Sequence, residues 1–184
     1  MFASRSLAGL LLLTLALSAA AEDGHLLRKQ RFAGSAHVGP VQLQPVQFEF
    51  ACHPAKNGAL SVSVVLSKGD NAGGFALDAY EGPDGAGEQG DVAEWSVDTR
   101  GDGLQVKGPI SGWYGVDGDG FIVARSQPNA RPGALGSLVK AVVDAQSRRL
   151  RLSVAAPGKG EPLQAELLLD GKQEAIREVV AACL

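Results

Sequence analysis

Histidine is the side chain that most readily exchanges protons near neutral pH, and this chain has three. They are His25, His37 and His53, and none of them belongs to a known catalytic motif. A serine hydrolase would also need a serine on a sharp turn, and the Gly-x-Ser-x-Gly pattern of such turns does not occur. We therefore expect surface or strand-end histidines and a protein that is not an enzyme. A hydrolase whose site is assembled in space stays open as an alternative, because triads need no sequence proximity.

Candidate metal ligands are scattered as well. Asp117-Gly118-Asp119-Gly120 matches part of a calcium loop, but an EF-hand needs a further acid and a terminal glutamate, which residues 121–125 do not supply. The segment 81–91 has four acidic residues and no basic one. It is typical either of a solvated loop or of a site for a cation or a basic partner. We predict no metal and no cofactor, and leave open whether Asp117, Asp119 or the acidic loop 81–91 binds a cation.

The segment with the clearest potential for binding is 108–120. Aromatic residues make up only 5% of the chain, yet Trp113 and Tyr114 are adjacent and flanked by Gly112 and Gly115. Neighbouring side chains on a strand point to opposite faces, so the two rings cannot enter one core. We predict that a loop over 112–120 presents Trp113 and Tyr114 to a protein or glycan partner. The alternative is a tryptophan that plugs the end of a sheet.

Residues 1–21 have the three parts of a cleavable signal peptide: a basic start at Arg5, an apolar run over 7–17, and Ala19-Ala20-Ala21 before a polar region. An eleven-residue helix is only about 16 Å long, roughly half the thickness of the hydrocarbon core, so we expect no stable membrane insertion. The sequence thus predicts a periplasmic or secreted protein that consists of a single β-rich domain, residues 22–184.

Charge argues against nucleic acid as a partner. The whole chain carries a formal net charge of −3, and cleavage would remove Arg5 and no acid, leaving −4. Nucleic acids and anionic membranes select basic surfaces, so we expect neither as a partner.

The chain contains two cysteines, Cys52 and Cys183. An even number of cysteines in an exported chain predicts a disulfide, and the two are too far apart in sequence for a Cys-x-x-Cys redox pair. Cys183 lies on the apolar stripe of a predicted C-terminal helix, and Cys52 belongs to the apolar set of a predicted strand. We therefore predict that a disulfide ties this helix to the sheet.

Most of the chain alternates with a period of two, which is typical of strands with one buried face. Asn57-Gly58 is the strongest hairpin signal, between predicted strands over 41–52 and 60–66. Pro45 shifts the alternation by one residue and indicates a bulge or an edge strand. Further strands are predicted by alternation in these segments: 31–36, 75–79, 95–97, 104–110, 121–124, 150–154 and 163–169.

The period changes to that of a helix in two places. Apolar residues at helical spacing over 135–143 predict an inserted helix. Asp170 followed by Gln173 matches a capping box and predicts the start of the C-terminal helix. The fold class is therefore α+β and mainly β: an antiparallel sandwich or barrel of about seven or eight strands with these two helices.

These features favour an exported, non-enzymatic binding or inhibitor module that acts through surface loops. A periplasmic hydrolase and a structural envelope protein are the alternatives.

Overall fold

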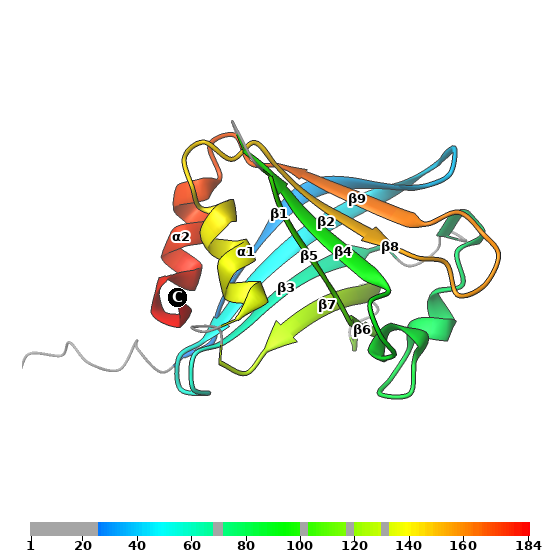
Figure 1. Ribbon diagram of the computed structural model, residues 1–184, viewed down its shortest axis with the longest axis horizontal. Coiled ribbons are helices and arrows are strands. Elements are labelled where there is room, and N and C mark those ends of the chain that lie inside the picture. Colours follow the sequence, from blue (N-terminus) through cyan, green and yellow to red (C-terminus); the bar gives the residue numbers. More distant parts are fainter. Residues whose placement is uncertain (1–25, 68–71, 100–102, 117–119, 130–132) are drawn as a thin grey trace, which may run out of the picture.

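The computed structural model describes residues 26–67, 72–99, 103–116, 120–129 and 133–184. In these residues nine strands form one antiparallel sheet in the order β5-β4-β8-β9-β1-β2-β3-β7-β6, curled into a half-barrel (Figure 1). The strands are β1 Arg28–Val38, β2 Val41–His53, β3 Ala59–Leu66, β4 Ala93–Asp98, β5 Leu104–Gly108, β6 Ser111–Tyr114, β7 Phe121–Gln127, β8 Arg149–Val154 and β9 Leu163–Leu168. The predicted mainly-β α+β fold is confirmed, as a single curled sheet rather than a two-sheet sandwich.

The β2–β3 hairpin turns where the sequence predicts it. Asn57 and Gly58 have φ values of 57° and 71°, both in the left-handed region. They are the two central residues of a turn, closed by the Ala59 amide on the Lys56 carbonyl, inside a connection of five residues, 54–58. Asparagine and glycine adopt the left-handed conformation at the lowest steric cost. The turn brings His53 opposite Ala59 and so sets the register of the two central strands.

The irregularity predicted at Pro45 is a bulge in the β1–β2 pair. Gly34 lies opposite Val46 and Ala36 opposite Leu43, so two residues of β2 oppose one residue of β1. Because proline has no N–H to donate, an unpaired bulge position accommodates it within a central strand.

The two helices lie together at one end of the half-barrel (Figure 1). They are α1 Ala134–Val142 and α2 Gln173–Val180, the latter continued by a 3₁₀ turn, Ala181–Cys183. Their apolar sides join the buried core of the sheet, whose largest members are Trp95, Tyr80, Phe48, Phe50 and Phe121. None of the described helices has the length and apolar character needed to cross a bilayer.

The predicted capping box of the last helix is wrong. The helix begins at Gln173 after Lys172, with no side-chain cap. Gly171 takes a φ of 72°, which turns the chain between Asp170 and the helix. The amide Nε2 of Gln173 instead donates to the carbonyl of Ser147, 2.9 Å away.

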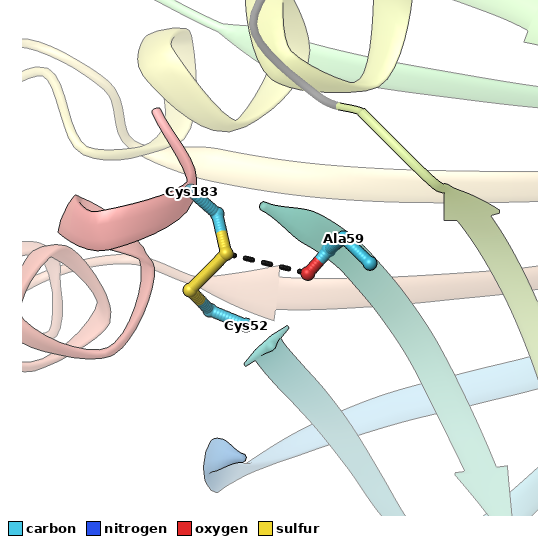
Figure 2. The surroundings of a disulfide bond; sticks show 3 residues. All are labelled: Cys52, Ala59 and Cys183. Atoms are coloured by element: carbon cyan, nitrogen blue, oxygen red, sulfur yellow. Dashed lines mark hydrogen bonds between the residues drawn. A yellow bond between two sulfur atoms is a disulfide. The ribbon is translucent and has the colours of Figure 1, made fainter. Parts of the chain in front are cut away.

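The disulfide between Cys52 and Cys183 is confirmed. Figure 2 shows the bridge between the end of β2 and the last turn of the chain, with the Cys183 Sγ 3.3 Å from the Ala59 carbonyl oxygen. The two Cα atoms are 5.9 Å apart and both side chains are fully buried. The bridge therefore fixes the C-terminal helical segment against the central strands.

The strand predicted over 75–79 is wrong. The segment forms short 3₁₀ turns instead, Ala72–Gly74, Leu77–Tyr80 and Ala86–Glu88. Phe75 and Tyr80 are both buried and stack with ring centroids 5.4 Å apart, which a flat strand would prevent because these residues would face opposite sides.

The segment 72–92 lies at the end of the half-barrel away from the helices (Figure 1). It packs along the link between the sheet's two edge strands. The amide of Gly82 donates to the Gly112 carbonyl and the amide of Ile110 donates to the Gly87 carbonyl, both at 2.9 Å. The turns thus protect backbone groups that the edge strands would otherwise expose.

Candidate functional site

The residues predicted to form an aromatic loop begin on a strand instead. Ser111–Tyr114 forms β6, the edge strand next to β7. The prediction of a loop over 112–120 is therefore wrong for its first three residues. The candidate cation ligands Asp117 and Asp119 lie outside the described residues.

Three apolar side chains are exposed at this edge. Trp113 is 39% exposed, Tyr114 40% and Val116 fully exposed. They are three of the seven large hydrophobic side chains exposed among the described residues, and they fall within four positions of the chain. We call Trp113, Tyr114 and Val116 the β6 edge patch.

The two aromatic rings lie on opposite sides of the sheet. Trp113 is paired with Ile122 on the outer face. Tyr114 is paired with the inward-facing Phe121, against which its ring packs edge to face at 5.0 Å. The Tyr114 hydroxyl donates a hydrogen bond to the carboxylate of Asp78. The edge of the sheet thus presents one aromatic ring on each face.

Gly112 allows β6 to approach the 72–92 segment. A Cβ at this position would lie 2.5 Å from the Tyr80 carbonyl oxygen and 2.7 Å from the Phe121 ring. Both distances are too short for a carbon atom, and one of the obstructing atoms is backbone. The patch therefore depends on a residue without a side chain directly before Trp113.

We expect Gly112→Ala to lower the free energy of unfolding by about 1–3 kcal/mol, the usual cost of overpacking a tight site. Urea denaturation measures this change. Gly160→Ala is the control, because the one atom within 4 Å of its added methyl group is the Cβ of the partly buried Ala156, 3.3 Å away. Equal stability of the two variants would contradict the close packing of Gly112.

Five exposed acidic side chains lie on the segment next to β6, and we call them the acidic rim. They are Asp78, Glu81, Asp84, Glu88 and Asp91. No lysine, arginine or histidine occurs between residues 72 and 92. The segment that carries the rim therefore has five negative charges and no positive one.

The pKa of Tyr114 reflects the negative charge of the rim. Its pKa is raised, first by the hydrogen bond to Asp78 and further by desolvation and by the negative charges of Asp78 and Glu81. Burial raises the pKa of Tyr80 as well, and its hydroxyl donates to the Ala155 carbonyl. Both phenols are donors, so the folded state favours their neutral forms.

These shifts predict a loss of stability at alkaline pH. A raised folded pKa means that the stabilisation is complete below about pH 10, the unfolded value, and is lost as the pH rises through the folded pKa. Tyr114→Phe should remove part of this loss, and Asp78→Asn should move the Tyr114 titration to lower pH. Phenolate absorbance at 295 nm follows both tyrosines. An unchanged titration in Asp78→Asn would contradict the assignment.

A surface hollow of about 630 Å³ lies over the outer side of β1, β4, β8 and β9. Arg151 lines this hollow and is held between two acids: its Nε is 2.9 Å from Glu166 Oε2, and its Nη1 is 2.8 Å from Asp98 Oδ2. His37 also lines this hollow. Within the described ranges, no hydrogen bond joins His37 or His53 to a serine or an acidic side chain.

A second hollow of about 640 Å³ lies beside the start of α2, between Gln146 and Gln173. It contains no histidine. In the part of the chain that the structure describes, no three His, Cys, Asp or Glu side chains come together in a way that could hold a metal ion.

One unusual residue was not singled out from the sequence. Arg125 points to the inner side of β7, in line with the buried Phe121 and Val123. Its Nη1 is buried and has no hydrogen-bond partner among the described residues, and burial lowers its pKa while the charge of Asp91 opposes this effect. A Cβ on Gly108 would lie 2.7 Å from this nitrogen, so the guanidinium rests against the end of β5. The sequence signal for this residue is an arginine at a strand position where the alternation calls for a buried apolar side chain.

No family model, curated protein or solved structure matches this chain.

Proposed function

We propose that this chain is an exported, non-enzymatic binding module, with residues 1–21 as its signal peptide and the β6 edge patch as its contact surface. One observation carries the proposal: Trp113, Tyr114 and Val116 are exposed together at a sheet edge, whereas the other four exposed large apolar side chains of the described residues are Leu26 and Leu27 at the start of the described chain and the single residues Val41 and Leu168. Clustered exposed apolar groups are typical of interaction sites. Tryptophan and tyrosine are enriched in binding hot spots because they offer a large rigid contact area.

The position of the patch supports this function. A side chain on an edge strand can be covered by a partner without any rearrangement of the core. Trp113 faces outward, and the ring of Tyr114 is held by Asp78 and Phe121 before a partner arrives. A side chain that is already held loses little conformational entropy on binding.

We expect Trp113→Ala to abolish partner capture from cell-envelope extract by the immobilised mature protein, because a hot-spot tryptophan contributes about 2 kcal/mol or more. Leu168→Ala is the matched control, since Leu168 is 52% exposed on the distant strand β9. Protease treatment of the extract distinguishes a protein partner from a glycan.

A thermal melt of Trp113→Ala and of Leu168→Ala first shows that both variants are folded. Capture of the same partner by folded Trp113→Ala would disprove the proposal. Loss of capture in both variants would contradict it as well, because the effect would then not be specific to the patch.

A further inference from the structure

We infer that the β6 edge patch binds a positively charged polypeptide surface, in which arginine or lysine side chains accompany apolar ones. This inference rests on the proposed function and adds the chemistry of the partner. Its basis is the contact between the patch and the acidic rim, residues that are far apart in sequence.

The rim is attached to β6 at three of its four residues. The Ser111 hydroxyl donates to the carboxylate of Glu88. Gly112 forms a parallel bridge with Glu81, and Tyr114 donates to Asp78. Two of these three contacts involve the carboxylates themselves, so the negative charges of Glu88 and Asp78 lie directly beside Ser111 and Tyr114 of β6.

The rim carboxylates differ from the acids on the outer face of the sheet. Glu49, Glu94, Asp98 and Glu166 each form a salt bridge with an arginine or a lysine. Within the described residues, the acids of the rim from 78 to 88 form no salt bridge; two of them accept hydrogen bonds from neutral hydroxyls. A hydroxyl donor orients a carboxylate but leaves its charge uncompensated, so these four acids retain their negative potential, whereas the charge of Asp91 acts on Arg125.

Aromatic rings and carboxylates side by side fit arginine and lysine best. A guanidinium or ammonium group is attracted to the face of tryptophan or tyrosine and forms charge-assisted hydrogen bonds with a carboxylate. The aliphatic stems of these side chains pack against apolar surface such as Val116. A single metal ion fits less well, because the described acids do not converge on one point.

The test uses two labelled twelve-residue peptides, one with alternating arginine and leucine and one with glutamate in place of arginine. Fluorescence anisotropy with the mature protein should show at least tenfold tighter binding of the arginine peptide at low salt. Trp113→Ala should weaken this binding by about tenfold. Glu81→Gln/Asp84→Asn should weaken it by about fivefold.

Asp170→Asn/Glu178→Gln is the matched control. It removes the same net charge from exposed positions near and on α2, at the other end of the half-barrel (Figure 1). We expect its affinity for the arginine peptide to stay within about twofold of the unmodified protein, because exposed charges at this distance are screened by salt.

The outcomes separate this inference from the proposed function. Three results would overturn the inference that the partner is basic: equal affinity for both peptides, equal losses of affinity in the two acid variants, or no binding of either peptide. The proposed function would survive each of these results if capture from envelope extract still required Trp113. If neither peptide binding nor capture depended on Trp113, both would fail.

Discussion

Trp95→Ala is expected to lower the free energy of unfolding by about 3–5 kcal/mol. Trp95 is fully buried on β4, where it is paired with Val106 of β5 and Leu152 of β8. Truncation would remove apolar contacts on both sides and leave a cavity that three paired strands cannot close. Urea or guanidinium denaturation followed by far-UV circular dichroism measures the change.

Trp113→Ala is the matched comparison, because these two are the only tryptophans in the chain. Trp113 is two-fifths exposed on an edge strand, so we expect its truncation to cost less than about 2 kcal/mol. Trp95→Phe should also be mild: the buried Nε1 of Trp95 has no partner within the described residues, and phenylalanine removes this unsatisfied donor. Equal losses in Trp95→Ala and Trp113→Ala would contradict the burial of the two rings.

Loss of the disulfide has the second largest expected effect. Cys183→Ser should lower the free energy of unfolding by about 2–5 kcal/mol, because the bridge joins residues 131 positions apart and restricts the unfolded chain. The double variant Cys52→Ser/Cys183→Ser should lose a similar amount, since the single variant already lacks the bridge. If the denaturation midpoint of the unmodified protein were the same with and without reductant, the prediction would be wrong.

Local signals made much of the fold predictable. Asn57-Gly58 specifies its turn through the conformations of two adjacent residues, and Pro45 marks a bulge because proline lacks an N–H. The apolar stripe that contains Cys183 required a packed helix face, which placed the disulfide correctly. Each of these features depends on a few neighbouring residues.

The errors lie where distant contacts decide the structure. The alternation over 75–79 satisfies a strand pattern, but the segment has no continuous strand partner and folds as turns along the link between β5 and β6. The adjacency of Trp113 and Tyr114 indicated that both rings would not enter one core. The acidic residues beside them could not be predicted, because Asp78 is 36 positions from Tyr114 and only the curl of the sheet brings them together.

The short pairing of β1 with β9 divides the curled sheet into two parts. Among the described strands, the backbone pairing between β5-β4-β8-β9 and β1-β2-β3-β7-β6 consists of four residue pairs, Ser35–Val38 with Leu163–Glu166. The chain passes from one part to the other after β9, because α2 and the turn Ala181–Cys183 pack against β1 and β2, where the Cys52–Cys183 bridge holds them. Reduction would therefore free this C-terminal segment from the sheet, and amide hydrogens of α2 would exchange with solvent before those of the β2–β3 hairpin.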